Sequence, residues 1–188
     1  MSGKLIYPTP QITTGNWATV NDSVAQNKVG GIYPSYDSKN RPIWIKYVQF
    51  NPTAAAAMVA GAPVYYKDLT RTIVTNTVTE AASHVALSCR ANQSLAGLLG
   101  NASATVGYFI FILVKGPFDA ISVPAATVSG DLLIASNAAA TVPTDNVFAR
   151  VAAGTAPAIS EWAGSGYCVS LGAVAAGIAP GYVRCDPS

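Results

Sequence analysis

The sequence contains few residues that could form a catalytic or metal-binding site. It has a single histidine, His84, and three cysteines, Cys89, Cys168 and Cys185. A cysteine and a histidine can act together as nucleophile and base when a third group orients the base. No oxyanion-stabilising or orienting partner accompanies His84 and Cys89, and the spacing of the cysteines does not fit a tetrahedral metal site. We therefore expect neither a catalytic pair nor a bound metal.

The acidic residues occur singly along the chain. They are Asp22, Asp37, Asp68, Glu80, Asp119, Asp131, Asp145, Glu161 and Asp186. Two distant carboxylates could meet as a glycosidase pair, but Asp68, Asp119, Asp131 and Asp145 stand in turn contexts, which favours a role in turns. Phosphate-binding and dinucleotide-binding glycine motifs are absent, and the serine at 165 lacks the frame of a nucleophile elbow. The sequence predicts a protein that is not an enzyme and needs no cofactor.

The composition of the 188-residue chain excludes some classes of partner and favours others. Charged residues make up 11% of the chain, against roughly 25% in an average soluble domain. The net charge is +2 without a basic run, so we expect no nucleic-acid partner. The longest apolar run, residues 106–114, is far shorter than the roughly 20 residues of a membrane span. Low charge predicts a surface partly covered by other protein, as in an oligomer or larger assembly.

The amino-terminal start and the cysteines indicate the compartment in which the protein folds. Residues 1–5 lack the apolar core of a secretory signal, so we expect folding in a cytoplasm. Three cysteines are too few for a disulfide framework. Reduced thiols are favoured, and a bridge between Cys168 and Cys185 within a final hairpin is the alternative.

Residues 106–117 form the most apolar and aromatic-rich stretch of the sequence. β-Branched and aromatic residues without polar alternation predict a central strand buried on both faces, ended by Gly116 and Pro117. Further strands are expected from alternation and turn residues. They cover residues 43–50, 64–67, 70–79, 95–100, 120–123, 132–135, 147–150, 167–170 and 182–184. Residues 53–61 could form a helical turn or two, and residues 80–92 are ambiguous.

A local pattern of a small or β-branched residue, a glycine and then a strand recurs at irregular intervals. It occurs at Gly61, Gly107 and Gly130, and more loosely at Gly177. Glycine in such a pattern supplies turn backbone angles that other residues rarely adopt. Many short strands with this punctuation predict an all-β fold, a small barrel or a sandwich.

Residues 1–40 are polar and rich in turn residues, with apolar side chains scattered without a period. Such a segment cannot bury enough surface alone to offset the entropy of ordering it. Either it wraps the body of the domain, or it is an extended arm that becomes ordered on a partner. As an arm before a β-rich domain of residues 41–188, it offers several partner-binding residues: Ile6, Tyr7, Ile12, Trp17, Tyr33 and Tyr36.

Five segments of the sequence resemble the capsid decoration, or cement, proteins of tailed bacteriophages. They are residues 47–51, 59–68, 95–99, 106–117 and 128–133. That family has an A-G-x-P-V-Y entry, an A-G-Y-x-x-F-I-x-V-x-G central strand and a following G-D-x-L strand. The resemblance covers roughly residues 43–155 and leaves out the amino-terminal segment and a carboxy-terminal extension rich in alanine and glycine.

The resemblance implies a small β-barrel or β-tulip domain, often trimeric, that clamps neighbouring major capsid subunits from outside. It transfers no catalytic residue. We therefore expect a virion structural protein on the capsid exterior, made in the host cytoplasm, with the major capsid protein and itself as partners. Long repeats or heptads, which would favour the alternative of a fibre, are absent, and a tail or head-fibre base protein stays open. The other alternative is a carbohydrate-binding β-sandwich that uses aromatic residues, namely Trp44, Tyr65, Tyr66, Tyr108 and Trp162; such residues more often form core or interface.

Overall fold

The computed structural model describes residues 16–53, 58–68, 70–77, 95–100, 102–134, 147–151 and 166–185. Strands make up 50% of the described residues and helix only 3%, which confirms the predicted all-β class. One short 3-10 helix, η1 (Asn16–Thr19), precedes the strands. The strands are β1 (Ile32–Tyr36), β2 (Pro42–Phe50), β3 (Pro63–Tyr66), β4 (Ile73–Thr75), β5 (Leu95–Leu99), β6 (Phe109–Ser122), β7 (Leu132–Ile134), β8 (Ala149–Val151), β9 (Gly166–Ser170) and β10 (Ile178–Cys185). Within these ranges no helix is long and apolar enough to cross a membrane.

Strands β2, β4, β3, β5 and β6 form a closed barrel. They are neighbours in that order, and β6 also pairs with β2, which closes the ring. The pairing of β2 with β4 is parallel and the other barrel pairings are antiparallel. The Lys46 Nζ of β2 donates a hydrogen bond to the Tyr66 hydroxyl of β3 at 2.9 Å. Because β4 separates these two strands, the bond crosses the barrel interior. Val48 of β2 and Ile110 of β6 lie on the same interior face as Lys46 and form part of the core.

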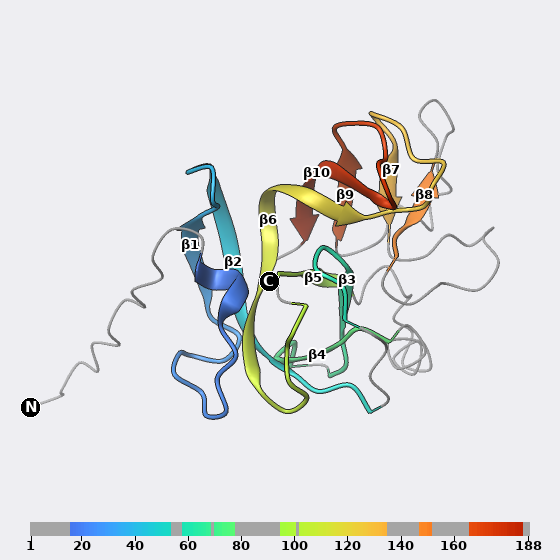
Figure 1. The fold of residues 1–188 in the computed structure, drawn as a ribbon. Helices are drawn as coiled ribbons and strands as arrows, with labels where there is room; N and C mark the ends of the chain where they lie inside the picture. The colour runs from blue at the N-terminus through green and yellow to red at the C-terminus, as the bar shows by residue number, and fades with distance from the viewer. Residues whose placement is uncertain are drawn as a thin grey trace, which may run out of the picture.

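Strand β6 is the longest strand of the described residues, and its two halves pair with different strands of the same sheet. Its first half pairs with β2 and β5, and its second half, from Lys115 to Ser122, pairs with β10. In Figure 1 it rises through the middle of the molecule and bends over the top, so that its halves lie in different parts of the fold.

The prediction that Gly116 and Pro117 end the central strand is wrong. Pairing with β2 stops at Lys115, so the proline, which lacks an N–H, removes no bond to β2. Gly116 has a φ of +130° and packs so closely on Ile43 that a Cβ would lie 2.8 Å from its Cγ2 atom. The two residues therefore mark a change of partner, and residues 120–123, expected to be a separate strand, continue β6 up to Ser122.

Beyond β6 the sheet continues through β10, β9, β7 and β8, all antiparallel. These strands occupy the upper right of Figure 1. One face of this sheet is buried, with Cys168, Val183 and Leu133 in the core. The opposite face carries the exposed side chains of β10, Tyr182 and Arg184, and is described below.

The described part of the amino-terminal segment packs on the barrel. Trp17 is only 3% exposed, and its ring makes an edge contact with Phe118 at 6.2 Å between centroids. Asp22 forms a backbone bridge with Phe109 and accepts a hydrogen bond from the Tyr47 hydroxyl at 2.5 Å. Strand β1 adds to the edge of β2. The predicted arm is therefore corrected for residues 16–36, which wrap the domain; residues 1–15 lie outside the described residues.

The glycine pattern is confirmed at all four positions. Gly61, Gly107, Gly130 and Gly177 have φ values of +81°, +85°, +90° and +78°. Each lies in a turn before a strand or at the start of one.

Most predicted strands are present with shifted ends, although the strand at residues 70–79 is reduced to β4 and strand β1 was not predicted. Residues 80–92 and 54–57 lie outside the described residues, and Thr53 and residues 58–61, the rest of the segment that could form a helical turn, are not helical.

Candidate protein-binding face

The strongest candidate for a functional surface is the exposed face shared by strands β1, β2, β6, β10 and β9. Strand register places Trp44 of β2 opposite Pro34 of β1 on one side and Lys115 of β6 on the other. Lys115 in turn lies opposite Arg184 of β10. Residues directly opposite each other on neighbouring strands project to the same face, so these side chains form one row across four strands.

A second row runs beside the first. Pro117 of β6 lies opposite Tyr182 of β10, and Tyr182 lies opposite Val169 of β9. The hairpin from β9 to β10 continues the face, because the Leu171 N–H donates to the Pro180 carbonyl at 2.8 Å. We call Tyr36, Trp44, Lys115, Leu171, Ile178, Tyr182 and Arg184 the outer face.

The outer face carries most of the large apolar side chains that are exposed among the described residues. Nine large apolar side chains are exposed among the described residues, and five of them belong to this face. Trp44 is 45% exposed, Tyr182 39% and Leu171 58%. The remaining four, all valines, are single side chains in loops and turns: Val24, Val59, Val106 and Val128.

The sequence of β10 explains why these side chains point outward. Alternate residues from Ile178 to Arg184 are exposed or half-buried, whereas the residues between them are buried. The buried set consists of small or apolar residues, Ala179, Gly181, Val183 and Cys185. A Cβ on Gly181 would lie 2.6 Å from the Cδ1 atom of Ile121. The inner face therefore has no room for larger side chains, and the strand cannot turn its tyrosine and arginine inward.

The charges of the outer face are positive. Lys115 and Arg184 are exposed, and neither forms an ion pair with a carboxylate of the described residues. The nearby Asp119 is already bound by Lys39 at 2.9 Å and Arg41 at 3.0 Å. The hydrogen bond from Lys39, followed by that from Arg41, holds the pKa of Asp119 below its usual value despite partial desolvation. The Asp119 carboxylate is therefore ionised and engaged within the β1–β2 turn network at neutral pH.

The six residues predicted to bind a partner have different fates. Tyr36 lies on the outer face, opposite Pro42 in the register of β1 and β2. Tyr33 is half-buried with its ring against Phe111 at 5.8 Å. Trp17 is buried in the core, so its assignment to a partner is wrong; the apolar ring is covered by Phe118 and the backbone at Gly100. Ile6, Tyr7 and Ile12 lie outside the described residues.

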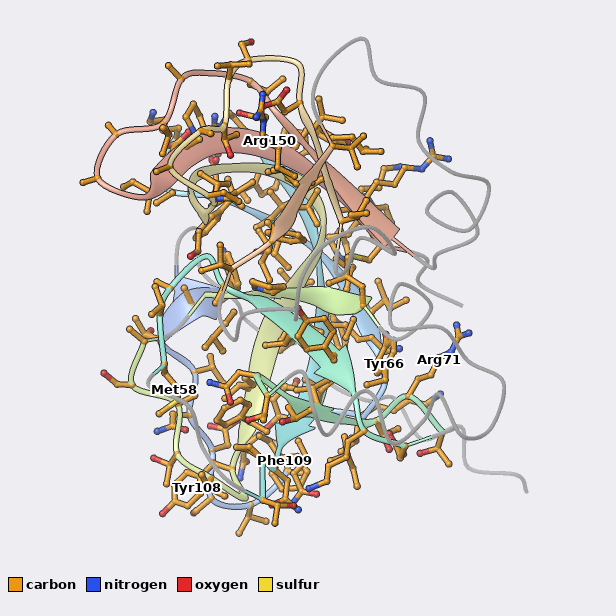
Figure 2. All side chains as sticks on the ribbon, turned by 90° about the vertical axis from the view of Figure 1, so that its right-hand side faces the viewer. Met58, Tyr66, Arg71, Tyr108, Phe109 and Arg150 are labelled. Atoms are coloured by element: carbon orange, nitrogen blue, oxygen red, sulfur yellow. The ribbon has the colours of Figure 1, made fainter. Side chains whose placement is uncertain are left out.

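The aromatic platform of the carbohydrate alternative does not form as predicted. Tyr65 and Tyr66 are buried. The Tyr66 ring is approached by the Lys46 ammonium at 4.8 Å and the Arg71 guanidinium at 5.9 Å, and Figure 2 shows Tyr66 and Arg71 close together. Of the four described residues among these five, only Trp44 is on the outer face. Tyr108 is half-buried, at the other end of the molecule from Arg150 (Figure 2). Trp162 lies outside the described residues.

Two predicted turn carboxylates have that role. Asp68 accepts hydrogen bonds from the backbone N–H groups of Thr72 and Ile73. Asp131 is fully buried, accepts the Val128 N–H at 2.8 Å and binds the Arg150 Nε at 2.5 Å. Asp119 instead lies within β6, and Asp145 is outside the described residues.

The two cysteines of the last hairpin are buried free thiols, as the sequence favoured. Burial raises the pKa of Cys185 to about 12 and that of Cys168 well above its usual value. His84 and Cys89 lie outside the described residues. In the part of the chain that is described, no three potential metal ligands come together.

Sequence reasoning missed most of the outer face, although a signal was present. Between residues 178 and 185, large or charged residues alternate with small or apolar ones, which is the pattern of a half-exposed strand. The prediction placed a strand only at residues 182–184 and so missed the pattern. Lys115 directly follows the apolar central run, and the prediction made it part of the buried strand.

No protein-family model, curated protein or solved structure matches the chain.

Proposed function

We propose that the protein is a non-enzymatic virion structural protein that binds the outside of a phage capsid and cements neighbouring major capsid subunits. The observation that carries the proposal is the outer face, an exposed sheet surface on which Tyr36, Trp44 and Tyr182 lie beside Lys115 and Arg184. Aromatic residues and arginine are the residue types enriched at protein interfaces and their energetic centres.

The exposed apolar area supports a protein partner. Large contiguous apolar patches on a soluble protein often mark protein–protein interaction sites, whereas single exposed apolar side chains are common. The outer face gathers five exposed large apolar side chains on one sheet surface, and the chain as a whole has only 11% charged residues. Both observations agree with a protein that functions while bound to other subunits.

The barrel supports the same proposal through the five segments that resemble decoration proteins. These segments contribute to β2, β3, β5, β6 and β7, and to the glycine turns before β3, β6 and β7. The resemblance therefore falls on the barrel, on β6 and on the first strand after it. A trimer, as in that family, is part of the proposal.

Cementing follows from simple linkage. A protein that binds the assembled shell, and not its separated subunits, stabilises the shell in proportion to the logarithm of its free concentration over the dissociation constant. A closed barrel with a covered interior is a rigid support for such a contact, because its backbone hydrogen bonds are satisfied within the ring.

The test uses capsids assembled without this protein. Purified full-length protein is added, and co-sedimentation and the temperature of capsid disruption are measured. We expect saturable binding and a raised disruption temperature. The double variant W44A/Y182A should lose both effects, whereas V106A, which removes an exposed apolar side chain at a turn away from the outer face, should keep them.

Absence of saturable binding by the wild-type protein would overturn the proposal. The next measurement would then be a glycan array, since Trp44 and Tyr182 are also the exposed aromatic residues that a carbohydrate-binding function would use. Unchanged binding by W44A/Y182A would keep the decoration function and remove the outer face from it.

A further inference from the structure

We infer that the outer face recognises a partner segment that carries carboxylate groups, with Lys115 and Arg184 as the residues that bind them and Trp44 and Tyr182 as their apolar frame. The inference rests on the proposed function for the identity of the partner, the capsid. It adds the chemistry of the contact, which the decoration role alone does not specify.

The first argument is the placement of two cations side by side. Lys115 and Arg184 are directly opposite each other on neighbouring antiparallel strands. Side chains in this relation have Cβ atoms about 4.5–5.5 Å apart, and like charges so placed destabilise the pairing. Neither residue forms an ion pair with any carboxylate in the described ranges. A carboxylate from outside would relieve this repulsion, which makes the pair a natural anion-binding position.

The second argument is that the carboxylates of the described residues are already in use. Each of the five acidic residues in the described ranges accepts a hydrogen bond or forms an ion pair within the domain. The contacts are Asp22 with Tyr47, Asp37 with Arg41, Asp68 with Thr72 and Ile73, Asp119 with Lys39 and Arg41, and Asp131 with Arg150. A second copy would have to break one of these contacts to bring any of these five carboxylates to the outer face. Residues 1–15 carry Lys4 and no acidic residue, so they supply no carboxylate either.

The third argument concerns the surroundings of the two cations. Trp44 lies opposite Lys115 on the other side, and Tyr182 is two residues before Arg184 on the same face. Apolar side chains around a polar contact exclude water once the partner is bound. A charge pair in a less polar environment interacts more strongly than one in bulk water. The frame thus favours a partner segment that combines carboxylates with apolar side chains.

The test compares three single charge reversals, K115E, R184E and K28E. Lys28 is also exposed, and its N–H donates a hydrogen bond to the hydroxyl of Tyr33. The Tyr33 side chain packs on Phe111, on the face of the sheet opposite to Trp44. Capsid binding is titrated at low and at high NaCl concentration. We expect salt to weaken wild-type binding, and K115E and R184E each to weaken it about tenfold or more at low salt, as measured for closely contacting charge pairs. K28E should behave like the wild type.

A second probe makes the inference testable without capsids. A random copolymer of glutamate and tyrosine, labelled with a fluorophore, is titrated with each protein at low salt, and polylysine serves as the opposite-charge control. We expect the copolymer to bind the wild type and K28E, to bind K115E and R184E at least several-fold more weakly, and polylysine not to bind the wild type. Thermal unfolding of each variant verifies that the exposed substitutions leave the fold intact.

The outcomes separate the two proposals. Wild-type capsid binding that K115E and R184E leave unchanged would overturn the inference and keep the decoration function. No capsid binding, with copolymer binding that depends on Lys115 and Arg184, would overturn the decoration function and keep the carboxylate-binding face. If sedimentation shows that the two reversals abolish self-association while capsid and copolymer binding persist, the occupant is a second copy and the inference is wrong.

Discussion

Substitution of Gly61 by alanine should destabilise the barrel far more than the same substitution at Gly107. The two glycines have nearly the same backbone angle, with φ values of +81° and +85°. Their surroundings differ completely. A Cβ at Gly61 would lie 1.8 Å from the Ala120 carbonyl oxygen, whereas a Cβ at Gly107 would meet nothing within 4 Å.

The expected magnitudes follow from this difference. The left-handed backbone angle costs an alanine about 1–2 kcal/mol at either position. At Gly61 the turn must also move away from β6, which breaks the hydrogen bonds from Gly61 N to the Leu99 carbonyl and from Ser122 N to the Gly61 carbonyl. With each bond contributing about 0.5–1.5 kcal/mol, the total loss for G61A is about 2–5 kcal/mol, against about 1–2 kcal/mol for G107A.

Urea unfolding of the wild type and both variants measures these losses. Circular dichroism and tryptophan fluorescence should report the same transition midpoints, and G177A, at another uncrowded turn with a φ of +78°, should match G107A. Equal destabilisation by G61A and G107A would refute the close approach of the Gly61 turn to β6. It would also show that the backbone angle alone sets the loss of stability at both positions.

Three further predictions concern buried and titrating groups. Because burial raises the pKa of Cys185 to about 12 and also raises that of Cys168, both thiols should resist iodoacetamide at pH 8 until urea unfolds the protein, as peptide mapping would show. R150A should lose about 3–5 kcal/mol because it leaves the buried Asp131 carboxylate without this cation, and the double variant D131N/R150A should be more stable than R150A in urea unfolding. For Asp68, burial raises the pKa, but hydrogen bonds from the following turn lower it by more, so the pKa in the folded protein is below its ordinary value. The stabilisation by the Asp68 carboxylate is therefore complete above the ordinary pKa near 3.9 and is lost as pH falls through the lower folded pKa. D68N should therefore show a shallower fall of melting temperature between pH 5 and 2 than the wild type.

Local signals in the sequence predicted the parts of the fold that depend on local chemistry. The glycines at 61, 107, 130 and 177 were expected to supply unusual backbone angles, and all four do. The alternation in residues 43–50 likewise predicted β2 with an error of one residue. These features depend only on a few neighbouring residues, so one sequence is enough to predict them.

Features that depend on distant partners were not predictable in this way. Gly116 and Pro117 normally punctuate a strand, and nothing nearby in the sequence shows that β10, some sixty-five residues later, takes over the pairing. Trp17 stands in a polar, turn-rich stretch and resembles a residue kept for a partner until Phe118 is seen to cover it. The outer face combines Trp44, Lys115 and Tyr182, which only the strand register brings together.

The shared strand β6 has a consequence for how the chain folds as it is synthesised. All five barrel strands precede residue 123, whereas β10, the partner of the second half of β6, is the last strand to emerge. During translation the barrel can close while residues 115–122 still present an open edge, and an open edge invites pairing with other nascent chains. Lys115, Pro117 and Asp119 stand on that edge, and charges and proline are the devices by which natural sheets discourage such pairing. Gly116 and Pro117, which mark the change of partner in the folded protein, thus also hinder incorrect pairing of this edge until β10 has been synthesised.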